Sequence, residues 1–254
     1  MLSYKLLFFL PLISTIFTYP FGVLLGEKTA QYFSSTLISI AAILSWFLFI
    51  SFSSSSSSEI IIPVLEWFFV SGQFFNWGIS VNSLTLLMLT LVLTVSALVH
   101  IYSIEYMSHD NSKVRFMTYL SLFTFCMVAL VVSDNLIQLF FGWEGVGLCS
   151  YFLIGFWFKK ETANAAAIKA FVVNRVGDFG FALGIFLIFY LFGTVNYIEV
   201  FDQIPTVVDE KLNFLGIQIN AIDLICILLF IGAMGKSAQI FLHTWLPDAM
   251  EGPT

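Results

Sequence analysis

Seven long apolar runs constrain the fold of this chain more than any other feature. A transmembrane α-helix needs about 20 apolar residues, because each residue rises 1.5 Å and the hydrocarbon layer is about 30 Å thick. Unlike the alternating segments of about ten residues in β-barrels, these runs are continuous. The sequence therefore predicts an all-α polytopic membrane protein with about seven transmembrane helices. The seven runs are Tyr4–Leu25, Ala30–Phe52, Leu84–Tyr102, Phe116–Val132, Asn135–Phe158, Ala163–Phe192 and Ile219–Leu242.

The composition excludes several classes of protein. Of the 254 residues, 59% are hydrophobic and 10% are charged, whereas a soluble domain has roughly 25% charged residues. Ten basic residues against 16 acidic ones leave no basic face for nucleic acid. The three cysteines, Cys126, Cys149 and Cys226, form no C-x-x-C pair, so neither a disulfide framework nor a zinc site is predicted. A soluble enzyme, a nucleic-acid-binding protein and a disordered chain are therefore excluded.

Polar connectors suggest how the chain is organised. The serine run Ser53–Ser58 predicts a flexible link. The next stretch, Glu59–Asn82, is too interrupted by proline and glycine to span a membrane, and we expect a hairpin against the membrane surface. Residues 1–82 are thus predicted to hold two spans and a connector, and residues 83–254 to form the functional repeat. The acidic segment Asn196–Lys211 is predicted to be a second extramembrane loop.

Lysine and arginine residues predict the orientation in the membrane, because they are enriched in cytoplasmic or matrix loops. Placing the N-terminus outside puts more of these residues in the inner loops than in the outer segments. The inner loops then hold Lys28, Lys113, Arg115, Lys159 and Lys160, and the outer segments hold Lys5 and Lys211.

Ionisable residues inside the apolar runs are the main candidates for function. A charge at the bilayer centre costs about 2.5–3.5 kcal/mol on insertion scales. Such residues persist when they are paired, face water or have a function. The five are Glu144, Lys169, Arg175, Asp178 and Lys236.

Glu144 lies about 13 Å into its helix, counting from Asn135. Gly142, Gly145 and neighbouring small residues give a surface that another helix can approach closely. Burial favours the neutral form of a carboxyl group and a nearby cation favours the charged form. Glu144 is therefore interpreted as a proton-binding carboxylate, with a buried structural ion pair as the alternative.

Arg175 and Asp178 are three residues apart and share a helix face. They form either a self-neutralising pair or a polar partner for Glu144. Lys169 lies nearer the helix start, where its side chain can reach the membrane surface, and is interpreted as structural.

Lys236 is the most informative residue, because the glycines Gly232 and Gly235 before it predict a helix break at depth. Broken helices are tolerated in membranes only where protein or water satisfies the freed backbone groups. A desolvated lysine can accept and release protons near neutral pH. The alternative is a salt bridge that holds the break together. His243 is a weaker candidate, and His100 is interpreted as a helix-end residue.

Three strings then carry a resemblance to a known family. They are LFFGWEGVGLCSYFLIGFW, KAFVVNRVGDFGFALGI and IGAMGKSAQIFLHTWLPDAMEGPT. They resemble the antiporter-like subunits, in particular subunit 5 of proton-pumping NADH–ubiquinone oxidoreductase, respiratory complex I. The match runs from about Asn82 to Thr254, while the first eighty residues fit mainly by their spans.

The resemblance implies a fold of two inverted five-helix repeats, each with a broken helix. It implies that Glu144 is the mid-membrane glutamate, that Lys236 is the lysine on the broken helix, and that Arg175 and Asp178 are the polar pair beside them. It further implies a non-redox, proton-translocating membrane-arm subunit, with no cofactor or metal in this chain. NADH, FMN, iron–sulfur clusters and ubiquinone are expected in other subunits.

The family pattern continues beyond PDAMEGPT, whereas this sequence does not. We therefore expect a subunit split between two polypeptides or a truncated product. In the first case a second membrane polypeptide supplies the missing C-terminal half. Other membrane-arm subunits and lipids are the expected partners, and nucleic acid is not. The expected location is the mitochondrial inner membrane, with a bacterial plasma membrane as the alternative.

Three other functions stay open from the sequence. The nearest is a cation/proton antiporter subunit of the same superfamily. The second is a structural membrane-arm segment, whose buried charges serve only packing. The third is an independent channel or carrier, which should be active when reconstituted alone.

Overall fold

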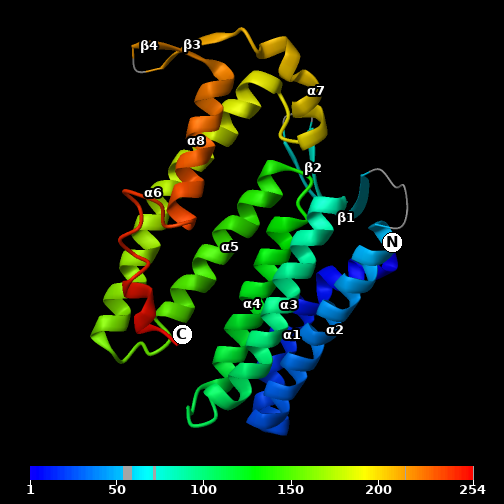
Figure 1. Cartoon of the computed structure of the whole chain (residues 1–254), viewed down its shortest axis with the longest axis vertical. Coiled ribbons are helices and arrows are strands. Elements are labelled where there is room, and N and C mark those ends of the chain that lie inside the picture. Colours follow the sequence, from blue (N-terminus) through cyan, green and yellow to red (C-terminus); the bar gives the residue numbers. More distant parts are fainter. Residues whose placement is uncertain (54–58, 71–72, 215, 254) are drawn as a thin grey trace. The chain divides into compact units, whose positions relative to one another are not determined.

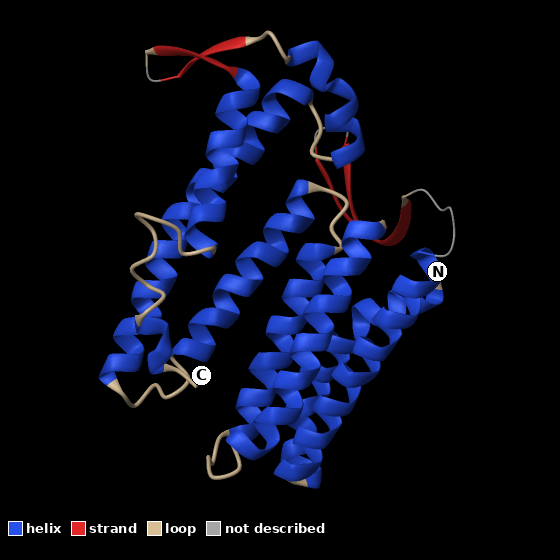
Figure 2. Cartoon of the chain, in the orientation of Figure 1, coloured by secondary structure: helices blue, strands red, loops and turns tan. Residues whose placement is uncertain are grey.

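A computed structural model describes residues 1–53, 59–70, 73–214 and 216–253. Within these residues the chain is dominated by α-helices, with two short antiparallel hairpins (Figures 1 and 2). Six helices are long and apolar enough to cross a membrane, which confirms the all-α polytopic class. They are α1 (Leu2–Leu25), α2 (Glu27–Ser53), α3 (Ser83–Tyr106), α4 (Lys113–Val131), α5 (Leu136–Ile154) and α6 (Glu161–Phe192).

The seventh predicted span is shorter than the sequence suggested. Helix α8 (Ala221–Lys236) has 16 residues and ends at Lys236, so the predicted continuation to Leu242 is wrong. Beyond Lys236, Ala238 and Phe241 have φ values of 48° and 77°, in the left-handed region that a right-handed helix cannot contain. The predicted break at Lys236 is thus confirmed.

The chain divides into two compact units. The N-terminal unit comprises Met1–Asp134 and Phe141–Cys149, and the C-terminal unit comprises Asn135–Phe140 and Ser150–Thr254. The division at residue 82 drawn from the sequence stays a prediction.

In the N-terminal unit, helices α1 to α4 pack against one another around an apolar core that includes Phe8, Ile38 and Leu93. Strands β1 (Ile60–Val70) and β2 (Gln73–Val81) pair antiparallel, so the predicted hairpin is confirmed. The flexible link predicted for the serine run lies, after its first residue, outside the described residues.

In the C-terminal unit, α6 and α8 lie side by side (Figure 1). Small residues allow this approach: a Cβ atom on Gly177 would lie 3.2 Å from the Cα atom of Gly235, and one on Gly232 would lie 2.5 Å from the Cβ atom of Phe181. Close backbone contact at glycine is a usual way for membrane helices to associate. The remaining elements are α7 (Tyr197–Val207), β3 (Lys211–Phe214), β4 (Ile217–Asn220) and the 3₁₀ helix η1 (Asp248–Glu251).

The acidic segment after α6 is not the loop that the sequence predicted. It contains the short helix α7, whose N-terminus is capped by Asn196, because the Asn196 side chain accepts a hydrogen bond from the Ile198 backbone N–H at 3.1 Å. Val200 and Val207 on this helix are buried. The cap and these apolar contacts favour a helix over a loop, although the segment contains a proline.

A larger residue at the glycine contact should separate α6 from α8. We expect Gly177→Leu to lower the stability of the protein by about 1–3 kcal/mol, because the added atoms meet backbone rather than a flexible side chain. Thermal unfolding of the detergent-solubilised assembly would measure this. The neighbouring Val176→Leu, on an exposed position of the same helix, is the matched control. Equal unfolding temperatures for the two variants would contradict the packing.

Candidate functional site

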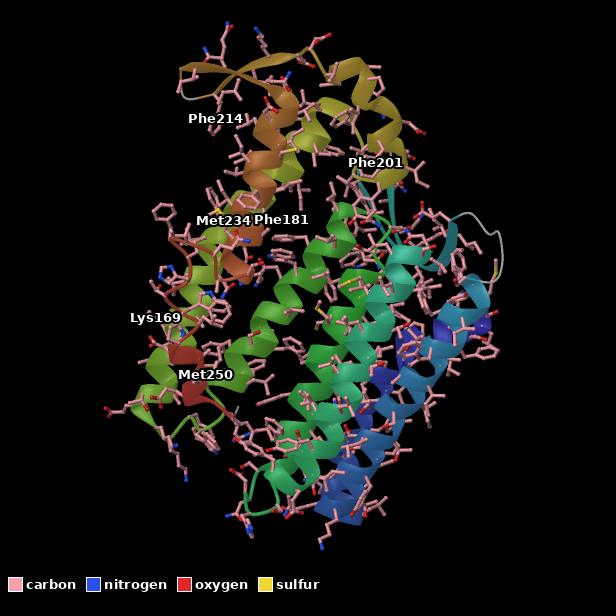
Figure 3. The ribbon with its side chains drawn as sticks, viewed as in Figure 1. Lys169, Phe181, Phe201, Phe214, Met234 and Met250 are labelled. Atoms are coloured by element: carbon pink, nitrogen blue, oxygen red, sulfur yellow. The ribbon has the colours of Figure 1, made fainter. Side chains whose placement is uncertain are left out.

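The central feature of the C-terminal unit is a buried ion pair between α8 and α6. Lys236 Nζ lies 3.5 Å from Asp178 Oδ2, and the two side chains are 17% and 4% exposed. Lys236 is the last residue of α8, and Asp178 lies inside α6. Figure 3 labels Met234 and Phe181 where these helices run together. Two residues that are 58 positions apart are thus joined in one site.

The helix geometry explains why this pair forms. Three glycines allow the two backbones to come close, namely Gly177, Gly232 and Gly235. The Asp178 and Lys236 side chains beside them can therefore meet. A lysine in the last turn also lies at the negative end of the helix dipole, which stabilises its positive charge. The Asp178 carboxylate, 3.5 Å from Lys236 Nζ, adds a formal negative charge beside the ammonium group.

The break after Lys236 is supported by groups from the following segment. The indole N–H of Trp245 donates a hydrogen bond to the Gly235 carbonyl oxygen at 3.1 Å. The Ser237 N–H donates to the Ala233 carbonyl at 2.9 Å. The last carbonyl groups of a helix have no partner inside it, and in a membrane they must be satisfied by other protein groups or water. These bonds hold Lys236 in place at the helix end.

The segment after the break is also tied to α6. Lys169 Nζ lies 2.6 Å from Asp248 Oδ2, and both side chains are nearly half exposed. The Thr162 hydroxyl donates to Glu251 Oε2 at 3.0 Å. Figure 3 shows Lys169 and Met250 close together in this region. The positive charge of Lys169 is therefore paired with the Asp248 carboxylate.

Asn174 is a polar residue of the site that the sequence did not single out. It lies one turn before Asp178 and is 8% exposed. Its side-chain nitrogen donates to the Ala170 carbonyl at 2.8 Å. Its Oδ1 atom is buried and accepts no hydrogen bond from any residue that the structure describes. A buried acceptor of this kind is a usual position for an ordered water.

The other predicted residues lie as follows. Arg175 is exposed on α6, with its guanidinium 4.8 Å from the centre of the Phe171 ring. Glu144 lies near the middle of α5 and belongs to the N-terminal unit. The pairing of Glu144 with Lys236 therefore stays a prediction. His243 is exposed in the turns after the break, where its backbone carbonyl accepts from Leu246 N at 3.1 Å.

No group of three histidine, cysteine, aspartate or glutamate residues is placed to hold a metal ion in the described part of the chain. What the site offers instead is a carboxylate and an ammonium group in a buried setting. A carboxyl group and an amine can each gain and lose a proton, and their opposite charges attract each other at this distance. Such a pair suits either structural support or proton exchange.

Removing one partner of a buried ion pair leaves an uncompensated charge, which costs about 3–5 kcal/mol. We therefore expect Lys236→Met or Asp178→Leu alone to destabilise the protein strongly. The double variant should recover most of this loss, because no charge is then left unpaired. The free energies of unfolding of the unsubstituted protein, the two single variants and the double variant give the coupling energy of the pair. Additive losses in the double variant would show that the two residues do not interact.

Comparison with known proteins gives two family matches. Residues 133–254 match the family described as NADH:quinone oxidoreductase/Mrp antiporter, TM. Residues 67–117 match the family described as NADH-Ubiquinone oxidoreductase (complex I), chain 5 N-terminus. The site residues Asp178 and Lys236 both lie inside the first match.

Individual relatives agree with these families. The chain is 53% identical over 238 residues to NADH-quinone oxidoreductase subunit L of Rhodobacter capsulatus, covering 91% of the chain and 33% of the relative. It is 51% identical over 253 residues to NADH-ubiquinone oxidoreductase chain 5 of Triticum aestivum, covering 99% of the chain and 37% of the relative. The chain thus spans about a third of the length of these relatives.

A solved structure shares the fold. A chain of the Mrp complex from Dietzia sp. DQ12-45-1b superposes with a TM-score of 0.78 at 22% identity, covering 99% of this chain and 25% of the other. A chain of an archaeal membrane-bound sulfane sulfur reductase gives the same score at 20% identity, covering 98% of this chain and 47% of the other.

Proposed function

Because the chain belongs to the antiporter-like family that includes complex I chain 5 and bacterial subunit L, we propose that it translocates protons in the membrane arm of an NADH:quinone oxidoreductase. It is a multi-pass protein of a mitochondrial or bacterial inner membrane. We propose the mitochondrial location, as the sequence motifs suggested. The subunit itself carries no redox step, and NADH oxidation and quinone reduction occur in other subunits.

The single observation that carries this proposal is the buried pair of Lys236 and Asp178 at the end of α8. In a membrane interior, ionisable residues that face a bundle interior are typical of proton pathways. Lys236 holds the exchangeable proton in this proposal. Asp178 stabilises the protonated ammonium while the two groups are close.

Proton release follows from a change in the distance between the partners. When Asp178 stays beside Lys236, the ammonium form is favoured, and when the carboxylate is drawn away the desolvated ammonium gives up its proton. In our proposal Glu144 competes for Lys236, and Arg175 tunes that competition. A water at the buried Asn174 oxygen would receive or supply the proton. Each cycle takes up one proton at Lys236 and releases one, so no net charge accumulates.

The energy and the partners come from the rest of the complex. NADH, FMN, iron–sulfur clusters and ubiquinone are assigned to other subunits, whose redox chemistry would drive the change at Lys236. Other membrane-arm subunits are the proposed neighbours. The chain itself spans about a third of the length of these relatives.

A second candidate function is a cation/proton antiporter subunit. The description of the matching family includes the Mrp antiporter, and the fold is shared with a chain of an Mrp complex. The identity of about half to chain 5 and subunit L favours the first function. Sodium/proton exchange by purified membranes without NADH-dependent quinone reduction would favour the antiporter instead.

The proposal predicts that the complex which assembles with either variant pumps fewer protons. In inner-membrane vesicles, Lys236→Ala and Glu144→Gln should each lower the protons pumped per NADH oxidised. The physical reason is that neither replacement can exchange a proton in the pathway. The measurement is quenching of a pH-sensitive dye during NADH oxidation, alongside native-gel quantification of the complex.

The matched control is Lys211→Ala, which removes a lysine from the exposed strand β3. It should leave pumping unchanged. If the assembled Lys236 and Glu144 variants pumped as well as this control, the residues would serve packing only and the chain would be a structural segment. Pumping by the isolated chain in liposomes would instead indicate an independent carrier.

A further inference from the structure

Buried polar side chains form a column through the four-helix part of the N-terminal unit. Each of helices α1 to α4 contributes residues spaced three or four positions apart, so that they share one helix face. This polar column contains none of the residues of the proposed proton site, because Asp178 and Lys236 belong to the C-terminal unit. Its members, with exposed fractions of 2% or less except for Ser96, are Ser14, Thr18, Gln31, Ser34, Ser96, His100, Ser103, Ser121 and Thr124.

The middle of the polar column is one hydrogen-bonded cluster around Ser121. The Ser121 Oγ atom lies 2.9 Å from Ser14 Oγ and 2.8 Å from Ser34 Oγ. In both contacts either hydroxyl can donate. His100 Nε2 lies 3.2 Å from the same Ser121 Oγ atom. Four helices therefore meet at a set of hydroxyl groups whose hydrogen atoms can be reordered.

His100 is at the centre of this cluster, whereas the sequence analysis interprets it as a helix-end residue. It is 0% exposed, because α2 and α4 pack against α3 beside it. Its Nδ1 atom lies 2.8 Å from the Ser96 carbonyl oxygen and 3.3 Å from Ser96 Oγ. Ser96 Oγ in turn lies 2.6 Å from Thr124 Oγ1. Both ring nitrogens are therefore engaged, one on each side of the imidazole.

The polar column continues from the cluster toward the end of the bundle where α1 meets α2. Thr18 lies one turn from Ser14, and Gln31 lies one turn from Ser34. Gln31 is 2% exposed, and its side-chain nitrogen has no hydrogen-bond partner among the residues that the structure describes. A buried amide donor left without a protein partner costs about 1–3 kcal/mol unless water satisfies it. This position is therefore suited to hold water.

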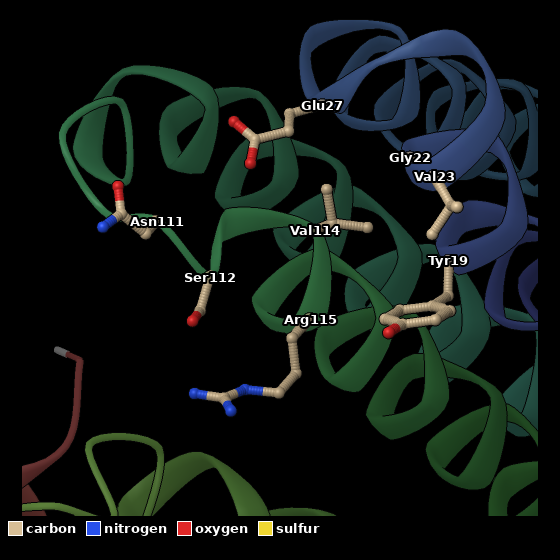
Figure 4. A pocket seen from close by; sticks show the side chains of 8 residues that line it. All are labelled: Tyr19, Gly22, Val23, Glu27, Asn111, Ser112, Val114 and Arg115. Atoms are coloured by element: carbon tan, nitrogen blue, oxygen red, sulfur yellow. The ribbon is translucent and has the colours of Figure 1, made fainter.

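An open pocket lies at this end of the bundle. It has a volume of about 280 Å³ and is lined by residues that include Tyr19, Glu27, Ser112 and Arg115 (Figure 4). Glu27 lies one turn before Gln31 on α2, so the pocket adjoins the polar column. The Glu27 carboxylate is 2.8 Å from Lys113 Nζ. Lys113 and Arg115 are among the basic residues that the sequence predicts to face the inner side of the membrane.

We propose that this polar column is a hydrated proton-access path that runs from the pocket beside Glu27 to His100. This inference rests on the proposed function and adds a second proton-carrying site to it. Interhelical bonds between hydroxyls also hold membrane helices together. Packing alone, however, does not explain why the buried Gln31 amide has no hydrogen-bond partner among the described residues, one turn from a residue that lines the open pocket.

The proton moves through His100 without net change. One ring nitrogen binds a proton that arrives through Ser121, and the other nitrogen releases its proton to the Ser96 hydroxyl. Ser96 passes its own hydroxyl proton to Thr124 Oγ1, and Thr124 releases a proton to water in the path, so each hydroxyl ends with one proton. Imidazole serves as a shuttle in this way because its two nitrogens are distinct. The hydroxyls of Ser121 and Ser14 exchange their roles as hydrogen-bond donor and acceptor. Each O–H bond that forms is therefore matched by an O–H bond that breaks. Ring tautomerisation then restores the starting state.

The first test asks whether the polar column contains water. In the assembled complex, with the exposed Cys226 replaced by serine, Ser34→Cys should react with a small, charged, membrane-impermeant methanethiosulfonate added from the inner side. The control is Ser45→Cys on the same helix, where the native hydroxyl is equally buried and donates to the Ala42 carbonyl of its own helix. Mass spectrometry of the labelled peptide gives the extent of reaction.

Reaction at Ser34→Cys with none at Ser45→Cys is the expected result. Equal labelling of the two positions, or none at either, would overturn the hydrated path. If Ser34→Cys does not assemble, Ser14→Cys tests the same cluster from α1. These labelling results do not depend on pumping activity.

The second test asks whether the polar column carries protons. His100→Gln keeps a polar, hydrogen-bonding side chain but cannot shuttle a proton, so pumping per NADH oxidised should fall about twofold or more while assembly persists. Unchanged pumping in an assembled His100→Gln complex, with pumping lost in Lys236→Ala, would overturn this inference and leave the proposed function intact. Unchanged pumping in both variants would contradict both.

Discussion

A charged side chain inside a membrane must have a partner, and the C-terminal unit is built around this constraint. Lys236 and Asp178 satisfy it for each other at 3.5 Å. In a low-dielectric interior this attraction is strong, but the cost of removing both charges from water is also large. The pair therefore contributes little net stability. The attraction between the two charges does, however, change steeply with their separation in such an interior.

The local fold is arranged to hold that pair. The glycine contacts bring α6 and α8 together, and the end of α8 places Lys236 where its backbone carbonyls need other partners. Trp245 supplies one of these partners through its indole N–H. The ion pair of Lys169 with Asp248 fixes the same segment to α6. The segment after α8 is thus held in a defined conformation by contacts to α8 and α6.

Much of this architecture could be predicted from the sequence, because apolar length and glycine position act locally. The six long helices, the β1–β2 hairpin and the break at Lys236 follow from such patterns. The contact of Asp178 with Lys236 does not, because it joins residues far apart in the chain. Arg175 lies three residues from Asp178 in the sequence, and its guanidinium lies over the Phe171 ring.

Two further features were missed for related reasons. Serine and threonine are common in membrane helices, so their spacing alone gave no sign that they meet around His100. The hairpin β3–β4 is short, and its sequence resembles ordinary loop residues. The contacts around His100 arise from packing between helices that no local pattern connects.

The most direct test replaces Lys236 with arginine. Arginine keeps the positive charge and the ion pair with Asp178, but its guanidinium does not release a proton in proteins. If Lys236 exchanges the pumped proton, an assembled Lys236→Arg complex will oxidise NADH but pump fewer protons per NADH. Full pumping by this variant would instead show that Lys236 only balances charge and takes no part in proton exchange.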